Sequence, residues 1–362
     1  MKTITCNIMQ GLRNIWTLLL VAMLVPATVS AAEDWKLQTG ANFQGKGTKE
    51  APYLIQNAQD LASIAYEVSS GWSSHNEYEG KYFKQTQDIV LNDDVQNSFT
   101  IDAYGRVTFD DGVISKFKEW LPIGIYGMSI LGYESPYWFK GHYDGDGHSI
   151  SGIYCYRGAL PGTFTDTKTG YDNYLGLFGA VQGGSIKNLT LKDCIIRVSE
   201  IAPNSNEWRY IGSVVGKAVD EEISNCTVEN AVICFDSGND PTQCCVGGVV
   251  GYCDLTDKYN GNYEISNCSF TGKLNVYNDA KNCSPSIGGI CGTINAAEGY
   301  LTAHKNPQLS NCAARGVIAY NYNNANPQEI GIYAGGILGK FSGPESSDAS
   351  NYASIYRCSN FI

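Results

Sequence analysis

The C-terminal half of the chain repeats one pattern of apolar, glycine and polar positions. The glycine motif occurs as NYLGLFGAV, RYIGSVVGKA, CCVGGVVGYC, PSIGGICGTI and IYAGGILGKF, closing on Gly179, Gly216, Gly251, Gly292 and Gly339. Each copy is followed by a second signature: SIKNLTL, EISNCTV, EISNCSF, QLSNCAA or SIYRCSN. Self-similarity at a spacing of tens of residues indicates a repeat architecture. Each unit predicts two or three strands of about four to six residues separated by turns.

We expect these units to stack, because one of them cannot bury its apolar face alone. In a stack of parallel strands, equivalent positions align in columns about 4.8 Å apart. One predicted column is apolar and contains Leu189, Cys226, Cys268, Cys312 and Cys358. Beside it, an amide ladder at a turn contains Asn188, Asn225, Asn267 and Asn311, with Arg357 in the last unit. The pattern predicts an all-β, parallel β-solenoid. A phosphate-binding loop is not expected, because no helix follows the glycine motifs.

A helix is predicted upstream of the repeats, over AQDLASIAYEVSSG. Asn57 can cap it, Asp60 lies three residues on, and Gly71 comes just past its end. Its apolar stripe consists of Leu61, Ile64, Ala65 and Val68. We expect this helix to cover the open edge of the first unit, as a repeat stack requires at its end.

The N-terminus has the composition of a secretory signal peptide. Lys2 and Arg13 precede the apolar run IWTLLLVAMLV, and small residues follow in PATVSAAED, so cleavage is expected near Ala31 or Ala32. The alternative is a membrane anchor, but the run is short against the roughly 20 residues of a membrane span. No later segment is apolar enough to span a bilayer. The predicted organisation is a signal peptide (1–32), a lead-in with the capping helix and first coils (33–140), and β-solenoid repeats (141–362).

Composition narrows the classes of partner. The formal net charge is −11, which argues against nucleic acid, because nucleic acid binds basic faces. The chain holds 40 glycines and 24 tyrosines, and this composition suits short strands and tight turns.

Two stretches of the repeats resemble a known family. IGSVVGKAVDEEISNCTVENAVI and VGGVVGYCDLTDKYNGNYEISNCSFTGKL resemble the GLUG-type repeat of bacterial surface proteins. Upstream, GTKEAPYLIQNAQDLASIAYEVSSG and FKGHYDGDGHSISGIYCYR resemble the lead-in of such repeats in secreted proteins of Bacteroides-type bacteria. The resemblance covers residues 47–362 and implies a right-handed parallel β-helix with adhesin-like roles. It brings no catalytic residues, and it leaves the last unit, ending YRCSNFI, incomplete.

Cysteines and the polar cluster HYDGDGHSI are the candidate chemical sites. Twelve cysteines follow the expected signal peptide, an even number that permits disulfides. The leucine in the cysteine column favours reduced, inward-facing thiols there, whereas Cys244, Cys245 and Cys253 are the expected disulfide formers. No C-x-x-C pair is present and only 4 histidines occur, so no zinc site is expected. HYDGDGHSI is predicted to be a turn, with a cation site or an acid–base pair as alternatives.

Binding is the expected function. The acids Asp193, Glu221, Glu222, Asp254 and Glu264 fall at different points of their units, most are expected to be solvated, and no catalytic motif is found. Tyrosine and asparagine in loops are typical of recognition surfaces. The candidate binding residues are Tyr171, Tyr174, Tyr259, Tyr263, Tyr320 and Tyr322.

The sequence therefore predicts an exported, non-enzymatic binding module without a cofactor. We expect it at the cell surface or outer membrane, or outside the cell, where it binds a glycan or a host or matrix protein. One alternative is a carbohydrate-active β-helix enzyme, because this fold also carries polysaccharide lyases and hydrolases. The other is a passive stalk.

Overall fold

The computed structural model divides the chain into Met1–Asp34 and the compact unit Trp35–Ile362. The expected signal peptide lies outside the described residues. These are Trp35 and residues 42–69, 78–102, 107–128, 134–157, 174–198, 208–236, 244–256, 263–278, 284–297, 308–322, 332–343, 355–356 and 358–361.

The described chain is mostly β-structure, as the sequence predicts, and most of its strands lie in four parallel sheets. Sheet 1 is formed by β1 (Tyr53–Ile55), β2 (Tyr82–Gln85), β8 (His142–Asp144), β13 (Ser185–Lys187), β18 (Glu222–Ser224), β22 (Ile265–Ser266), β26 (Leu309–Ser310) and β30 (Ile355–Tyr356). Sheet 2 is formed by β3 (Ile89–Val90), β9 (Ser149–Ser151), β14 (Thr190–Lys192), β19 (Thr227–Asp236), β23 (Ser269–Asn278), β27 (Ala313–Tyr322) and β31 (Ser359–Phe361), with β10 (Tyr154–Arg157) and β15 (Ile195–Val198).

The glycine motifs form the other two parallel sheets. Sheet 3 is formed by β11 (Tyr174–Leu175), β16 (Arg209–Gly212), β20 (Cys244–Gly247), β24 (Ser286–Gly288) and β28 (Tyr333–Gly335). Sheet 4 is formed by β12 (Phe178–Gln182), β17 (Val215–Val219), β21 (Val250–Leu255), β25 (Cys291–Ala296) and β29 (Leu338–Ser342). Two short antiparallel pairs join β4 (Phe99–Ile101) to β5 (Val107–Phe109) and β6 (Ile125–Met128) to β7 (Glu134–Tyr137).

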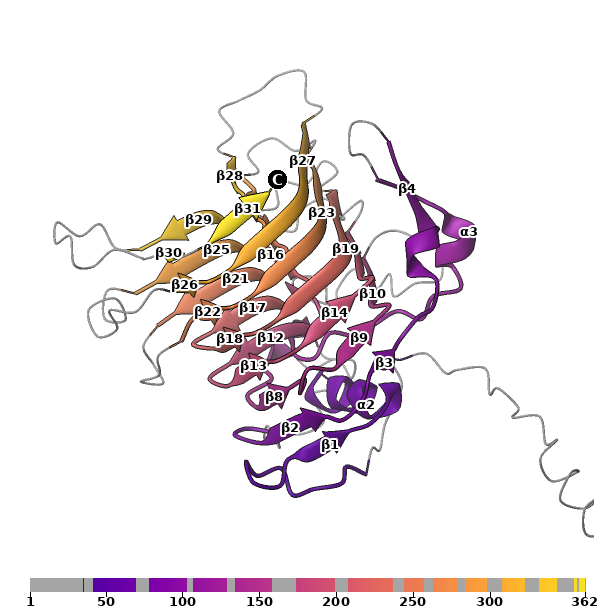
Figure 1. The fold of residues 1–362 in the computed structure, drawn as a ribbon, viewed down its shortest axis with the longest axis vertical. Coiled ribbons are helices and arrows are strands. Elements are labelled where there is room, and N and C mark those ends of the chain that lie inside the picture. The colour runs from indigo at the N-terminus through magenta and orange to yellow at the C-terminus, as the bar shows by residue number, and fades with distance from the viewer. Residues whose placement is uncertain are drawn as a thin grey trace, which may run out of the picture. The chain divides into compact units, whose positions relative to one another are not determined.

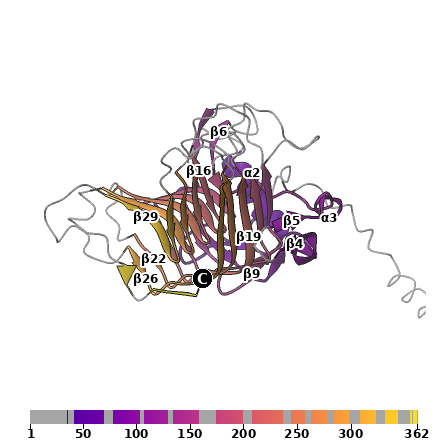
Figure 2. The same ribbon diagram turned by 90° about the horizontal axis from the view of Figure 1, so that it is seen from above.

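Each repeat adds a strand to each parallel sheet, and the first repeat adds two, β14 and β15, to sheet 2. Along one repeat the chain passes through β16, β17, β18 and β19, which belong to sheets 3, 4, 1 and 2. Strands of successive repeats therefore lie side by side (Figure 1), and β16 lies on a different side of the stack from β9 and β19 (Figure 2). The expectation of two or three strands per unit was wrong, because each glycine motif bends at its centre and forms a strand on either side.

The closing glycines form a column for a steric reason. The register places Gly216 between the pairs Phe178↔Val215 and Ala180↔Lys217, beside Gly179. A Cβ added at Gly251 would lie 2.6 Å from the carbonyl oxygen of Gly216 and 2.4 Å from the amide nitrogen of Ile211. Neighbouring backbones therefore approach too closely for any side chain.

The predicted asparagine column is also present. Asn188, Asn225, Asn267 and Asn311 have φ between 51° and 53°, which is the left-handed region. Asparagine adopts this conformation more readily than most residues with a side chain. Asn225 Nδ2 donates to Asn188 Oδ1 at 3.1 Å, and Asn188 Nδ2 donates to Asp144 Oδ1 at 2.9 Å. The ladder thus extends to the turn of the preceding unit.

The cysteine column points into the main core, as predicted. Cys226, Cys268 and Cys312 are free thiols with at most 1% of their surface exposed. Each donates to the carbonyl oxygen two residues before it, at 3.2–3.4 Å. The prediction that Cys253 forms a disulfide was wrong: it is a buried free thiol, and burial raises its pKa. Cys245 is fully buried, and its Sγ lies 3.3 Å from Thr293 Oγ1.

Helix α2 (Ala58–Ser69) confirms the predicted helix and its cap. Asp60 N donates to Asn57 Oδ1 at 2.9 Å, while Gln56 N donates to Asp60 Oδ2 at 2.8 Å, so the cap is reciprocal. Leu61, Ile64 and Ala65 of the predicted stripe are fully buried in the main core, and Val68 packs against it. Ser69 Oγ donates to the carbonyl oxygen of Pro122 at 3.1 Å, in the segment that pairs with β12. The helix therefore packs on the stack; that it covers the open edge of the first unit stays a prediction.

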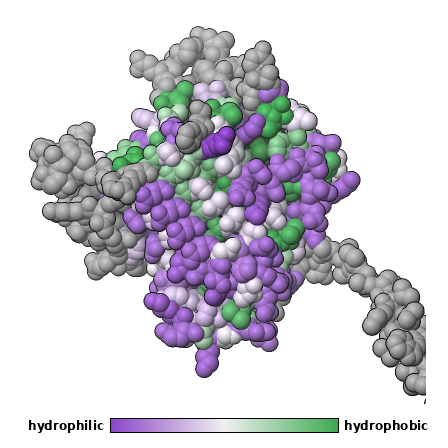
Figure 3. All heavy atoms as spheres, in the orientation of Figure 1, coloured by the Kyte–Doolittle hydropathy of each residue, from purple (hydrophilic) through white to green (hydrophobic). Residues whose placement is uncertain are grey.

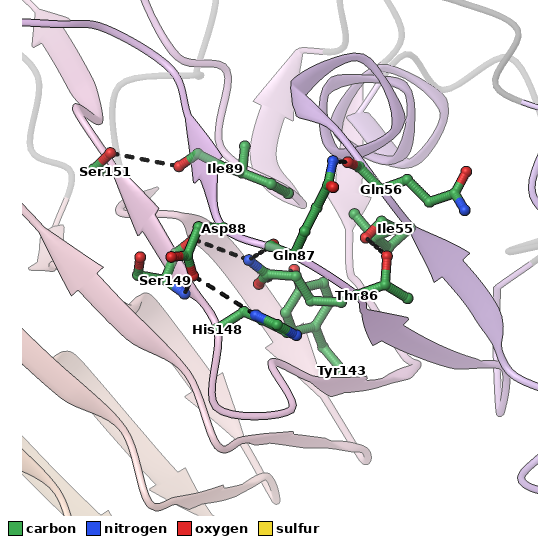
Figure 4. A network of polar contacts seen from close by, with 11 residues as sticks. Ile55, Gln56, Thr86, Gln87, Asp88, Ile89, Tyr143, His148, Ser149 and Ser151 are labelled. Carbon is green, nitrogen blue, oxygen red and sulfur yellow. Dashed lines mark hydrogen bonds and ion pairs between the residues drawn. The ribbon is translucent and has the colours of Figure 1, made fainter.

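A polar network connects the lead-in to β8 and β9 (Figure 4). Asp88 Oδ1 accepts from the Ser149 amide at 2.8 Å and lies 3.7 Å from His148 Nδ1. Gln85 Nε2 donates to the Ser149 carbonyl oxygen at 3.0 Å, and the buried Tyr143 hydroxyl donates to Gln85 Oε1 at 3.1 Å. The main core accordingly runs through both the predicted lead-in and the predicted repeats.

A small insertion covers part of the opposite face of sheet 2. It contains the 3₁₀-helix η2 (Val95–Ser98), β4, β5 and α3 (Asp111–Ile114). Its apolar side chains form a second core with Tyr154, Tyr156, Ile195 and Val232. The Arg197 guanidinium lies over the Phe109 ring, 4.7 Å from its centre.

Candidate functional site

A group of aromatic side chains lies on sheets 3 and 4, on the face turned away from the main core. Successive residues of a strand point to opposite faces. In β16, Ile211 belongs to the main core while Tyr210 belongs to a separate cluster with Tyr174, Ala180 and Cys245. Trp138 and Tyr252 pack against that cluster. We call Trp138, Tyr174, Tyr210 and Tyr252 the aromatic cluster.

The register of the repeats brings these rings together. Tyr174 lies beside Tyr210 across β11 and β16, and Lys217 lies beside Tyr252 across β17 and β21. The ring centres of Tyr174 and Tyr210 are 5.0 Å apart, those of Tyr210 and Tyr252 are 4.7 Å apart, and those of Trp138 and Tyr174 are 6.5 Å apart. Spacings of this size are typical of interacting aromatic pairs.

Lys217 places its ammonium group among all four rings. Its Nζ lies 5.8 Å from the centre of the Trp138 ring, and 5.7, 5.3 and 5.4 Å from those of Tyr174, Tyr210 and Tyr252. Each distance lies within the range of a cation–π interaction, about 6 Å. Burial lowers the pKa of Lys217, and the carboxylate of Asp254 opposes that shift.

Tyr210 and Tyr252 stay neutral over a wide pH range. Burial raises the pKa of both Tyr210 and Tyr252, with smaller contributions from Cys245 and Asp254. Tyr174 is 6% exposed and Tyr210 is 8% exposed, so these two rings form the floor of the cluster. Tyr252 and Trp138 are partly buried.

The rim of the cluster is more accessible. Trp208 is 45% exposed and stacks on Tyr210, with ring centres 6.2 Å apart and planes at 18°. Further along sheet 3, Tyr333 is 42% exposed, and Lys340 Nζ lies 4.6 Å from the centre of its ring. The sheet therefore presents exposed aromatic surface in two places.

Hydrogen-bonding groups border the rings on sheet 4. Thr293 lies beside Tyr252 in the register, and Asn295 lies beside Asp254. Asn295 Nδ2 donates to Asp254 Oδ1 at 2.8 Å. Aromatic surface combined with a few positioned polar groups is the composition of small-ligand sites in proteins.

The structure separates the tyrosines that the sequence selects. Tyr174 belongs to the aromatic cluster, but its expected place in an exposed loop was wrong, because it is buried in β11. Tyr263 precedes β22 of sheet 1, and Tyr320 lies in β27 of sheet 2; both are partly buried against the main core. Tyr322 ends β27, and its side chain lies outside the described residues, as do Tyr171 and Tyr259.

The other candidate sites from the sequence lie outside the aromatic cluster. HYDGDGHSI forms the predicted turn between β8 and β9: Asp146 has φ 50°, and its amide donates to Asp144 Oδ1 at 2.9 Å. No group of three or more His, Cys, Asp or Glu residues within the described ranges could hold a metal ion. Glu221 is buried rather than solvated. In the described part of the chain, no helix has the length and apolar character to cross a membrane.

Sequence reasoning missed Lys217, Tyr210, Tyr252, Trp138 and Trp208. The available signal was alternation inside the glycine motifs: in RYIGSVVGKA, the residues pointing away from the core are Tyr210 and Lys217. Treating each motif as one strand ending in a turn concealed this second face.

Comparisons with known proteins show no family for the chain, and no family model matches it. It is 30% identical over 155 residues to a "Putative Gly-rich membrane protein" of Evansella cellulosilytica, covering 42% of this chain and 12% of that protein. It is 28% identical over 216 residues to Halomucin of Haloquadratum walsbyi, covering 59% of this chain and 2% of Halomucin. The chain thus spans a small part of these relatives.

One solved structure is similar in part. It is described as a putative immunoglobulin A1 protease from Bacteroides ovatus, with 15% sequence identity and a TM-score of 0.31. The superposition covers 81% of this chain and 86% of that chain.

Proposed function

We propose that the protein is an exported, non-enzymatic binding module that takes glycans on its aromatic cluster. We further propose that the four parallel sheets are the faces of a right-handed β-solenoid of GLUG-type repeats. The repeated order of strands through sheets 3, 4, 1 and 2 supports the solenoid. The glycine and asparagine columns support the repeat type.

The observation that carries the binding role is the convergence of four rings and one ammonium group on a single sheet face. The C–H faces of sugar rings are apolar and pack on flat aromatic surface, while their hydroxyls need hydrogen-bond partners. Trp208 offers exposed ring surface, and Asp254 and Asn295 offer such partners. A rigid, aromatic and partly polar surface binds at low entropic cost.

The face formed by sheets 1 and 2 has a different character, which supports this choice. Figure 3 shows that hydrophilic side chains dominate the face formed by sheets 1 and 2 over their N-terminal strands. Charged residues there pair with one another, as in Lys84–Asp146 at 3.0 Å and Lys187–Asp144 at 3.7 Å. Paired, solvated charges bind partners weakly. The name of one relative, a Gly-rich membrane protein, supports a place at the cell envelope.

A glycan array with the full chain tests the proposal, with product release assayed on every glycan that binds. Trp208→Ala is expected to weaken binding by about tenfold, because stacking on an exposed aromatic ring contributes on the order of 1 kcal/mol. Tyr82→Ala is the matched control, because Tyr82 stacks on His142 on sheet 1.

Two results would contradict the proposal. Equal loss of binding in both variants would place the site elsewhere. Release of new sugar ends would show an enzyme.

A further inference from the structure

The ammonium group of Lys217 forms no ion pair with a carboxylate of the described residues. Among the described residues, no carboxylate lies within 4.0 Å of Lys217 Nζ. Its neighbours are the four rings, each more than 5 Å from Nζ at its centre. The side chain is half-buried, so water compensates the charge only in part. An anion that binds beside this ammonium group would stabilise it, because charge-assisted hydrogen bonds are strongest where water is scarce.

The groups around Lys217 carry little negative charge that would repel a bound anion. Tyr174, Tyr210 and Tyr252 face Lys217 as neutral phenols, and Cys245 is a buried thiol. Asp254 is the carboxylate whose charge acts on Lys217, and its Oδ1 already accepts from Asn295. An incoming anion therefore competes with one carboxylate that is engaged elsewhere.

We propose that the aromatic cluster selects acidic saccharides, in which Lys217 pairs with a carboxylate or sulfate group while the rings pack on the sugar to which it is attached. This inference rests on the proposed glycan-binding function. The shared chemistry is an anionic group on a pyranose ring, and both kinds of anion fit a single ammonium donor. Lysine acts there as a point charge, without the planar geometry of arginine.

A second lysine provides an internal contrast. Lys340 Nζ lies over the ring of Tyr333, in the same column of sheet 4 as Lys217. Only this one ring contact is described for Lys340, and its neighbour Tyr333 is 42% exposed. Lys340 is half-buried like Lys217 but faces one ring instead of four, so less aromatic surface is available beside it for the sugar that carries the anion. Lys340 is therefore the matched control for Lys217.

The experiment uses the full chain and two pairs of oligosaccharides that differ in one group. One pair has glucuronate or glucose in the same linkage, and the other has a sulfated or an unsulfated sugar. Calorimetry is expected to show binding at least about tenfold tighter for an acidic member than for its neutral partner, as expected for a charge-assisted hydrogen bond. The two pairs distinguish carboxylate from sulfate recognition.

Lys217→Met keeps the aliphatic stem over the rings and removes the charge. The ratio of affinities for the acidic and the neutral member should fall to about one in Lys217→Met, whereas Lys340→Met should keep the wild-type ratio. Lys217→Arg keeps the charge and should retain a preference, so it covers the case in which Lys217→Met does not fold.

The outcomes separate the two proposals. Equal binding of acidic and neutral partners by the wild-type protein would overturn the selectivity and leave glycan binding intact. A preference that survives in Lys217→Met would also overturn it. Failure of every saccharide to bind would overturn the proposed function and the selectivity together.

Discussion

Two columns of equivalent positions, one inside the stack and one outside, follow different rules. The inner column contains Leu189, Cys226, Cys268, Cys312 and Cys358. The outer column on sheet 3 contains Tyr174, Tyr210, Cys245, Ser286 and Tyr333. The inner residues are all leucine or cysteine and share an apolar character, whereas the outer ones range from serine to tyrosine.

The difference teaches where the repeat is constrained. Inside, each side chain is packed between neighbouring strands, where a polar group without a hydrogen-bond partner would be costly to bury, so apolar side chains are favoured. Outside, the backbone register is maintained while the side chains are free to vary. The aromatic cluster occupies the outer positions of three successive units, joined by Trp138 from the lead-in. Specific chemistry therefore lies where the units differ.

The largest loss of stability is expected when a side chain is added at a closing glycine. In Gly251→Val, the new Cβ would lie 2.4 Å from the Ile211 amide nitrogen and 2.6 Å from the Gly216 carbonyl oxygen, both backbone atoms. We expect a loss of about 3 kcal/mol or more in the free energy of unfolding, at or above the upper end for overpacking, measured by urea denaturation. The control is Gly112→Ala in α3, where a Cβ meets only Asp110 Oδ1 at 3.2 Å. Equal stability of the two variants would contradict the steric role.

Substitutions in the asparagine column should lower the stability less than Gly251→Val does. Asn225 has φ 53°, so Asn225→Ala forces an alanine into the left-handed region at a cost of about 1–2 kcal/mol. Asn225→Gly removes the hydrogen bond to Asn188 without that penalty, so its loss should be smaller. Thermal unfolding of both variants compares them. If glycine destabilises as much as alanine, the side-chain ladder rather than the backbone conformation is the main constraint.

The buried carboxyl group of Glu221 should make the stability of the stack depend on pH. Burial raises its pKa well above the ordinary value; Oε2 accepts from the Gly184 amide at 2.7 Å, and Oε1 has no hydrogen-bond partner among the described residues. The neighbouring Glu222 carboxylate raises this pKa further. Because the folded state holds its proton more tightly than the unfolded state, Glu221 contributes stability below its unfolded pKa. That stability is lost as pH rises toward the folded pKa.

Glu221→Gln should remove this loss, since glutamine cannot ionise. Urea denaturation between pH 5 and pH 8 is expected to show a smaller fall in stability for the variant than for the wild-type protein. Glu50→Gln is the control, because Glu50 is an exposed carboxylate. Parallel pH profiles for Glu221→Gln and the wild-type protein would show that Glu221 is ionised in the folded state.

Much of the stack was predictable from particular residues. The closing glycines, the left-handed asparagines and the inward cysteines lie in the columns that the repeats indicate, and Asn57 and Asp60 cap α2 as expected. The disulfide role of Cys253 was not borne out, because pairing depends on which face of a strand a thiol points to and what lies opposite. The exposed setting of Tyr174 was wrong for the same reason.

The sequence by itself determined the strand-rich class, the repeat unit and its inner columns, because a fixed spacing of glycine, asparagine and apolar residues has one efficient way to stack. Only the tertiary structure decided that the glycine motif bends into two strands, which directs alternate residues of both toward a second face. Trp138 and Lys217 are 79 positions apart in the sequence, but they meet on this face. The Nζ of Lys217 lies 5.8 Å from the centre of the Trp138 ring. Such a meeting depends on the lateral register of separate units and on the lead-in, and no periodicity along the chain encodes it.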